Sequence, residues 1–165
     1  MVMQTSCKKG MEQMDLLQAF EIIVDKAKGS SLGEKFYQES DPYLGFVSDK
    51  LCISKRASAI MALFADRCDD NHIQFSDYTD FLDCRILSLL RYSKETEELV
   101  DKEYVCRSKD EGLYYCIPME VMEAFQQNQR YIPSDVEELT ARELFDKFNE
   151  LLTKCRRRKL DRQIL

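Results

Sequence analysis

The sequence predicts a mostly α-helical fold with one small β-hairpin, and two observations carry this prediction. Along most of the chain, large apolar residues recur at three- and four-residue spacings, the period of a helix that packs on one side. The stretch YVCRSKDEGLYYCIP, residues 104–118, instead holds two β-prone runs around Asp-Glu-Gly, which is typical of a tight hairpin loop. At 165 residues, one domain with a terminal extension is expected.

The composition is that of a chain able to build an ordinary core, with 44% hydrophobic and 33% charged residues. No run of roughly 18 apolar residues occurs, and the N-terminus MVMQTSCKKGMEQMD has no apolar secretion core. We therefore expect a cytoplasmic protein without membrane contact. The seven cysteines include no C-x-x-C pair and His72 is the only histidine, so we expect reduced thiols and no metal site.

Two helical regions are expected at the start of the chain. The first helix is predicted over residues 11–28, and Gly29 supplies its stop. Residues 32–51 are predicted to form a short helix, a break at Asp41-Pro42 and a second helical start. The break is expected because proline disfavours the α conformation in the residue that precedes it.

Three further helices are expected before the hairpin. Ser54 is a good N-cap for an apolar-faced helix over residues 55–68. After a β-prone run at 73–75, Ser76 is expected to cap a short helix, and a longer helix should cover 84–104. The middle of that longer helix, SKETEE, is polar all round, so we expect it to bend there or to pack only its ends.

Helix, helix and hairpin follow one another over residues 72–118, which is the order of a winged helix. We expect this region to lie in a helical, winged-helix-like domain that spans residues 1–132. If the hairpin folds symmetrically about Glu111, Cys106 and Cys116 lie directly opposite each other on the two strands. We expect both thiols to be reduced.

An amphipathic connector helix is predicted within residues 133–165. Thr140 and Glu143 have the spacing of a capping box at its start. Its apolar stripe consists of Leu144, Phe148, Leu151 and Cys155. No stop signal ends this pattern before the last residue, which indicates a fragment of a longer protein.

No arrangement of residues predicts catalysis, a cofactor site or a metal site. The stretch GSSLGEK, residues 29–35, lacks the spacing of a phosphate-binding loop and no strand precedes it. The acids in DRCDDN, residues 66–71, lack the alternating ligands and central glycine of a calcium loop. His72 has no nucleophile or carboxylate at a catalytic spacing, so we expect this chain not to be an enzyme.

The charge distribution tests whether a winged helix here would read DNA. Residues 72–118 carry ten acidic and six basic side chains, a net charge of −4, whereas duplex binding usually needs several cations on one face. Arg85, Arg91 and Lys94 do lie together on the candidate recognition helix, and the basic run over 156–162 adds a net charge of +4. DNA binding is therefore kept as the less favoured alternative.

Three stretches carry a resemblance to a known family: KAKGSSLGEKFYQESDPYLGFVSDKLCISKRASAIMALFAD, IQFSDYTDFLDCRILSLL and YVCRSKDEGLYYCIPMEVMEAF. In their order the chain resembles the N-terminal winged-helix-like domain of bacterial AAA-family ATPases of the Bacteroidetes type. The resemblance implies that ATP and Mg²⁺ bind only in a module beyond Leu165, through which the protein could oligomerise. One departure is Glu103, which stands where winged helices often have a glycine before the first wing strand.

The resemblance implies a regulatory or protein-recruiting domain that binds a protein partner or positions its own ATPase module. The candidate surface for a partner, or for DNA in the alternative, consists of Arg85, Ser88, Arg91, Tyr92, Lys94, Glu95, Arg107, Lys109 and Tyr114. In the alternative, a winged-helix transcriptional regulator, Arg85, Arg91 and Lys94 would contact phosphates or bases.

Overall fold

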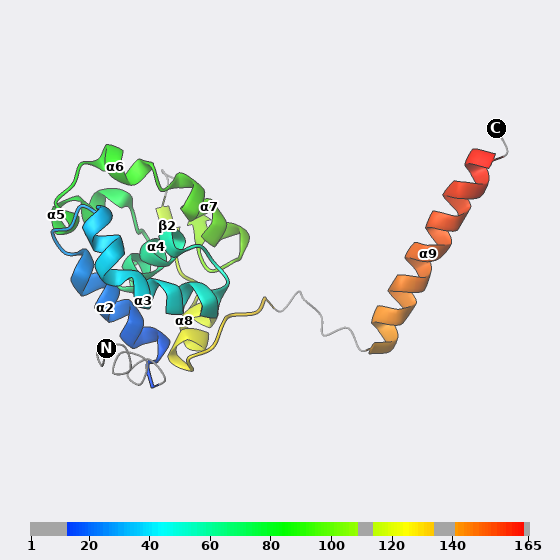
Figure 1. Cartoon of the computed structure of the whole chain (residues 1–165), viewed down its shortest axis with the longest axis horizontal. Coiled ribbons are helices and arrows are strands. Elements are labelled where there is room, and N and C mark those ends of the chain that lie inside the picture. Colours follow the sequence, from blue (N-terminus) through cyan, green and yellow to red (C-terminus); the bar gives the residue numbers. More distant parts are fainter. Residues whose placement is uncertain (1–12, 109–113, 134–140, 164–165) are drawn as a thin grey trace, which may run out of the picture. The chain divides into compact units, whose positions relative to one another are not determined.

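The computed structural model describes residues 13–108, 114–133 and 141–163, with side chains of the last segment described as far as Arg156. The chain divides after Tyr131 into two compact units (Figure 1). The first unit is mostly helical with a small two-stranded antiparallel hairpin, as the sequence predicts. Within the second unit the structure describes one helix, and each unit is considered by itself below.

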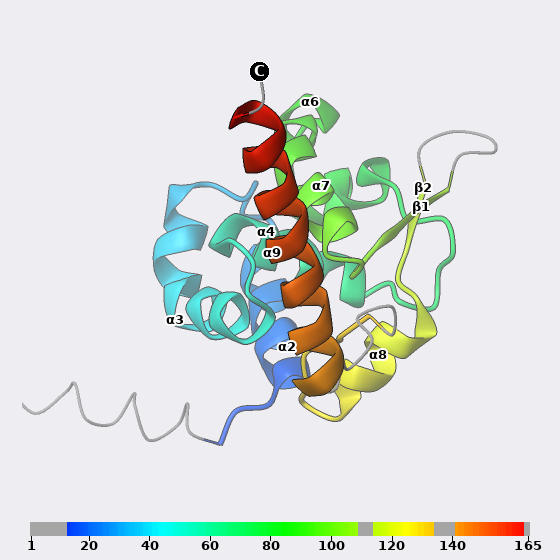
Figure 2. The same cartoon turned by 90° about the vertical axis from the view of Figure 1, so that its right-hand side faces the viewer.

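Three helices build the centre of the first unit: α2 (Leu16–Ala27), α3 (Glu34–Leu51) and α4 (Lys55–Ala65). The three pack against one another, and α4 lies in the middle of the unit in both views (Figures 1 and 2). Ser54 caps α4 by accepting a hydrogen bond from the backbone of Ala57, as predicted. Every residue of α4 from Ala57 onward is buried, so this helix is packed on all sides.

The start of α2 differs from the predicted start at residue 11. The described residues 13–15 are not helical, and the helix begins at Leu16. Asp15 ends the preceding segment, because its carboxylate accepts a hydrogen bond from the backbone of Gln18, 2.8 Å away. The side chain of Gln18 accepts in return from the backbone of Asp15, which completes a capping box. Residues 11 and 12 lie outside the described part.

The predicted break at Asp41-Pro42 is wrong, because α3 continues through Pro42. Proline removes one backbone hydrogen bond from a helix interior, here the one to the carbonyl oxygen of Gln38. Both Pro42 and Gln38 are exposed, so water can satisfy that carbonyl. The helix is held together by its opposite side, where the buried side chains are Phe36, Ser40, Leu44, Val47 and Leu51.

The single helix predicted over 84–104 is also wrong. The structure has two short helices in this stretch, α6 (Ile86–Leu90) and α7 (Ser93–Asp101), and they follow η1 (Phe75–Tyr78) and α5 (Thr79–Leu82). The chain breaks between α6 and α7 at Arg91 and Tyr92, upstream of the polar SKETEE segment. At the break the Tyr92 ring is buried, and its phenol oxygen lies within hydrogen-bond distance of that of Tyr37 on α3.

The predicted cap at Ser76 is wrong as well. Ser76 lies inside η1, and the residue that precedes this helix is Gln74. The backbone N–H of Gln74 donates to the carboxylate of Asp77 at 2.9 Å, so Asp77 satisfies a donor at the start of the helix.

The hairpin joins β1 (Cys106–Ser108) to β2 (Tyr114–Cys116), and its predicted register is confirmed because Cys106 lies opposite Cys116. The loop that contains Glu111 lies outside the described residues. On its other edge β2 forms an antiparallel bridge, in which Ile73 and Tyr115 exchange two backbone hydrogen bonds of 2.9 Å. Helix α8 (Met119–Gln126) follows β2 along the chain, and Figure 2 shows it at the lower right, below the two strands.

Glu103 occupies the turn into β1 with a left-handed backbone, φ +62°. Its N–H donates to the carbonyl oxygen of Val100, and the next residue, Tyr104, donates to that of Leu99. The turn therefore has a conformation that glycine adopts at lower cost. The chain thus has glutamate where a glycine was expected, but the turn before β1 is still tight.

The second unit contains α9 (Ala141–Gln163), so the predicted C-terminal amphipathic helix is present. Thr140, one half of the predicted capping box, lies outside the described residues. The predicted stripe is uncovered, because the exposed large side chains are Leu144, Phe145, Phe148, Leu151 and Leu152. No helix in the described part of the chain is both long enough and apolar enough to cross a bilayer.

Candidate functional site

The short helix α6 exposes three large apolar side chains on the first unit. Leu87 is 68% exposed, Leu90 52% and Ile86 39%, whereas Leu89 on the same helix is fully buried. Residues four apart are neighbours on a helix surface, so Ile86 adjoins Leu90, and Leu87 adjoins the exposed Arg91 at the helix end. Helix α6 lies at the periphery of the unit in both views (Figures 1 and 2).

Three cations flank α6 along the chain. Arg85 precedes α6, Arg91 follows it and Lys94 lies in the first turn of α7, and all three are exposed. In the described part of the chain none of the three takes part in an ion pair or a side-chain hydrogen bond. We use the name α6 face for Arg85, Ile86, Leu87, Leu90, Arg91 and Lys94 together.

Several other basic side chains of the first unit are engaged locally. Lys55 lies 2.7 Å from the carboxylate of Asp41, and Arg56 lies 2.8 Å from that of Glu95. Arg67 stacks over the Tyr78 ring with its guanidinium carbon 5.3 Å from the ring centre. An unpaired group of three cations within ten residues is therefore a local feature of α6 and its flanks.

Tyr92 and Glu95, both predicted to face a partner, belong to the interior instead. Tyr92 is only 5% exposed, and its phenol oxygen lies 2.6 Å from that of Tyr37 on α3. The guanidinium of Arg56 stacks 4.4 Å above the Tyr92 ring and donates through Nε to Glu95 at 2.8 Å. Tyr92 and Glu95 hold α7 against α3 and α4, and the prediction that they form a partner surface is corrected.

The electrostatics of this cluster follow from burial. Removal from water raises the pKa of Tyr37 well above its ordinary value, and its hydrogen bond with Tyr92 adds to the rise. Burial also raises the pKa of Tyr92, while Arg56 beside it acts in the opposite direction. Both phenols therefore stay neutral at physiological pH, and the cluster has the character of a structural contact.

The predicted residues of the hairpin are engaged with their neighbours. Arg107 lies 3.8 Å from the carboxylate of Glu97, and its guanidinium carbon is 5.9 Å from the centre of the Tyr115 ring. The half-buried Tyr114 packs edge-on against His72, with ring centres 5.0 Å apart. Lys109 lies outside the described residues. Of the predicted surface, Arg85, Ser88, Arg91 and Lys94 are exposed.

The three apolar members of the α6 face are absent from the predicted partner surface, and ILSLL lies at an end of the helix that the sequence predicts over residues 84–104. The high fraction of apolar residues in ILSLL could have indicated them. Four of its five residues are apolar, so they occupy more of the helix surface than one packed side can cover. Only Leu89 finds room inside.

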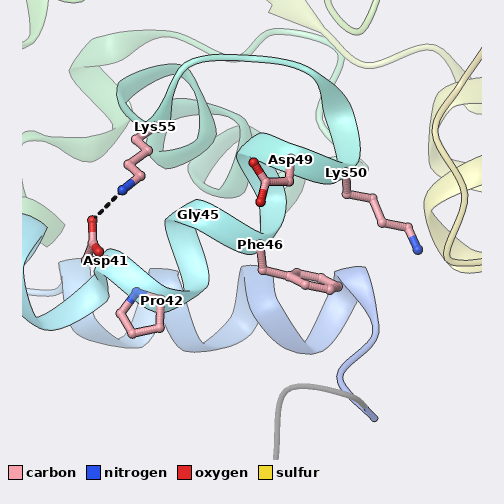
Figure 3. A pocket seen from close by; sticks show the side chains of 7 residues that line it. All are labelled: Asp41, Pro42, Gly45, Phe46, Asp49, Lys50 and Lys55. Atoms are coloured by element: carbon pink, nitrogen blue, oxygen red, sulfur yellow. Dashed lines mark hydrogen bonds and ion pairs between the residues drawn. The ribbon is translucent and has the colours of Figure 1, made fainter. Parts of the chain in front are cut away.

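Two hollows of the first unit were considered beside the α6 face. Figure 3 shows a shallow pocket on α3 that is lined by Asp41, Pro42, Gly45, Phe46, Asp49, Lys50 and, from α4, Lys55. Three of its four charged groups have partners in the lining, since Lys55 pairs with Asp41 at 2.7 Å and Lys50 lies 6.0 Å from the centre of the Phe46 ring. The pocket shows no unpaired buried group that would select a ligand.

The second hollow is an apolar groove of about 300 Å³ between α2, α4 and α8. Phe20, Val24 and Ala62 line its floor, and the exposed acids Glu21 and Asp66 lie at its edge. Its lining shows no chemistry beyond ordinary packing.

Within the described residues no three histidine, cysteine, aspartate or glutamate side chains are grouped so as to hold a metal ion. The α6 face is thus the most distinctive surface of the first unit. Comparison with known proteins adds no family to this description, since no family model, no curated protein and no solved structure matches the chain.

Proposed function

We propose that this chain is a non-catalytic, protein-recruiting domain whose α6 face binds a protein partner. The observation that carries the proposal is the exposure of Ile86, Leu87 and Leu90 next to one another. Adjacent large apolar side chains on the surface of a folded unit are typical of a site that another protein covers. The clustered arginines support this, because arginine is enriched at protein interfaces.

The order of elements in the first unit supports a winged helix as the framework of this site. Helix α4, the extended residue Ile73, the helices from η1 to α7 and the hairpin follow one another in the winged-helix order. The bridge from Ile73 to Tyr115 makes β2 the middle of three short extended segments. In this framework α6 and α7 take the place of the recognition helix, and the α6 face is the surface that it offers.

The wider context is proposed from the sequence resemblance. The chain would serve as the N-terminal regulatory domain of a cytoplasmic bacterial AAA-family ATPase, with α9 as the connector towards the ATPase module. ATP and Mg²⁺ would bind only in that module, and oligomers would form through it. The fold of a winged helix does not by itself fix its ligand, so protein recruitment is argued from the α6 face alone.

DNA binding by a winged-helix regulator is the second candidate, and the unpaired cations Arg85, Arg91 and Lys94 favour it. Against it, Leu87 and Leu90 occupy the part of the recognition helix that would enter a groove. The acidic balance of the region would also oppose the approach of phosphates. Protein binding uses both the apolar and the basic side chains, so it is the proposal that we keep.

The proposal is tested in living bacteria with a photo-reactive amino acid in place of Leu87, and in place of the exposed Gln38 on α3 as the matched control. We expect a discrete crosslinked protein from position 87, lost when Leu90→Ser is added, and none from position 38. Titration of the purified chain with duplex DNA at about 50 mM salt should show no salt-dependent binding. DNA binding without a crosslink at position 87 would favour the second candidate.

The proposal expects no nucleotide binding by this chain alone, so a saturable ATP titration of the purified chain would contradict it. The structure gives no reason to expect one, and the measurement is independent of the partner.

A further inference from the structure

The chemistry of the α6 face specifies what kind of partner segment fits it, and this inference rests on the proposed function. Its apolar part is formed by Ile86, Leu87 and Leu90, which are neighbours on less than two turns of helix. A surface of this size accepts a few large apolar side chains, such as those on one side of an amphipathic helix.

The charged part of the face is of one sign. From Cys84 to Lys94 the sequence contains three basic residues and no acidic one, although the whole chain has 30 acidic against 24 basic residues. Arg85, Arg91 and Lys94 are exposed and without an ion pair within the described residues. The cations of the face therefore have their charge available for a partner.

Glu95 is the first acidic residue after the α6 face in the sequence. It does not pair with the cations of the face, because it pairs with another arginine. Its carboxylate points to Arg56 of α4 at 2.8 Å, and its side chain is 13% exposed. Asp83 precedes the face, and its backbone is left-handed with φ +53°. No carboxylate is interleaved with the cations of the face in the sequence.

From these observations we infer that the α6 face binds an acidic amphipathic segment of another protein. Apolar side chains of the segment cover Ile86, Leu87 and Leu90, and its carboxylates meet Arg85, Arg91 and Lys94. Electrostatic complementarity of this kind selects the partner and speeds association, while the buried apolar contacts supply most of the affinity. Nucleic acid would satisfy the cations and leave the leucines uncovered.

The test uses the full chain and three synthetic fluorescent peptides of about 15 residues, long enough for a helix of several turns. The first has leucine at i, i+3, i+4 and i+7 with glutamate at most other positions. The second replaces each glutamate by lysine, and the third replaces each leucine by serine. Fluorescence anisotropy at low and at high salt measures the affinity of each.

We expect binding of the acidic leucine peptide only, and weaker binding as salt screens the charges. The double variant Leu87→Ser with Leu90→Ser should weaken it by about tenfold or more, since these side chains form the centre of the contact. Arg85→Glu with Arg91→Glu should weaken it comparably and remove its salt dependence. The control variants, Met119→Ser and Lys102→Glu with Arg130→Glu, change exposed residues of the first unit that do not belong to the α6 face and should bind unchanged.

Equal binding of the acidic and basic leucine peptides would overturn the inference. It would also be overturned if the acidic peptide bound with a Kd weaker than about 1 mM, which is a very low affinity. Thermal unfolding of each variant establishes that it remains folded. A crosslinked partner at position 87 together with a failed peptide test would refute the acidic segment and leave protein recruitment standing. Failure of both experiments would refute the proposed function itself.

Discussion

The phenol oxygens of Tyr37 and Tyr92 lie 2.6 Å apart, and this hydrogen bond joins α3 to the break between α6 and α7. Arg56 covers both rings, with its guanidinium carbon 4.4 Å from the centre of the Tyr92 ring and 5.9 Å from that of Tyr37. The contact sets where α6 ends and how α7 continues. It therefore positions the α6 face without being part of it.

The Tyr37–Tyr92 hydrogen bond is expected to contribute to stability in a non-additive way. Tyr92→Phe leaves the half-buried hydroxyl of Tyr37 without its partner and should lower the free energy of unfolding by about 1–2 kcal/mol. The double variant Tyr37→Phe with Tyr92→Phe should cost less than the sum of the two single changes, because no hydroxyl is then left unpaired.

Urea unfolding followed by circular dichroism measures these differences. Tyr43→Phe is the control, since the Tyr43 hydroxyl has no hydrogen bond among the described residues, and should change stability by less than about 0.5 kcal/mol. Strict additivity of the two single variants would contradict a direct bond between the phenols.

Glu103→Gly is expected to stabilise the first unit. Glu103 has φ +62°, a left-handed conformation that costs a residue with a side chain about 1 kcal/mol or more relative to glycine. Asp101→Gly is the matched control, because Asp101 is the exposed last residue of α7 and glycine lowers helix stability there. Thermal unfolding should show opposite shifts for the two variants, and equal shifts of the same sign would refute the role of the backbone conformation.

Gly45→Ala and Gly29→Ala should also have opposite effects. Gly45 lies inside α3, and an added methyl group would be 3.9 Å from Cε of Lys55, an ordinary contact, so alanine should stabilise by about 0.5–1 kcal/mol (Figure 3). Gly29 has φ +65°, so alanine there is strained although space is available, and should destabilise. Chemical denaturation of both variants checks the prediction, and stabilisation by Gly29→Ala would contradict it.

Stability at alkaline pH should reflect the burial of Tyr104. Burial raises the pKa of Tyr104 to about 12, above the ordinary value near 10, and its hydroxyl donates to the carbonyl oxygen of Leu51 at 2.9 Å. The folded chain thus holds the proton more tightly than the unfolded chain. The resulting stability is complete below pH 10 and is lost as pH rises through about 12.

The titration of Tyr104 is measured by the ultraviolet absorbance of tyrosinate, as the difference between the chain and its Tyr104→Phe variant. Circular dichroism at the same pH values reports whether the chain is folded. A difference signal with a midpoint near the ordinary value while the chain remains folded would be inconsistent with the buried phenol.

Burial should decide how much each apolar side chain of α8 contributes to stability. Phe125 is fully buried beside the rings of Phe20 and Tyr104, so Phe125→Ser should cost about 3 kcal/mol or more. Met119 on the same helix is 74% exposed, so Met119→Ser should change the free energy of unfolding by less than about 0.5 kcal/mol. Chemical denaturation of both variants measures the difference, and equal losses from the two would contradict the prediction.

The sequence by itself determined the elements whose signals are local. The cap at Ser54 needs only its own neighbours and was confirmed by the structure. The register that places Cys106 opposite Cys116 follows from the length of the loop between two β-prone runs. The C-terminal helix was predicted from its apolar periodicity and its capping-box spacing, both local signals, and is present as α9.

Tertiary structure decided the continuity of α3 and the division between α6 and α7. Pro42 argues for a break locally, but burial of Leu44 and Val47 beyond it outweighs one lost hydrogen bond on an exposed side. The run from Cys84 to Tyr104 argues for one helix locally, yet burial of Tyr92 against α3 divides it. Neither partner of such a contact can be identified from its own segment.

Tertiary structure also decided which candidate residues remain available for binding. The sequence shows that Ile86, Leu87 and Leu90 are apolar. Whether each of them is buried depends on which sides of α6 are covered by elements far away in the sequence. In the same way the charge of Glu95 is plain in the sequence, and only the fold brings it to Arg56. The binding surface is what remains after these long-range contacts are made.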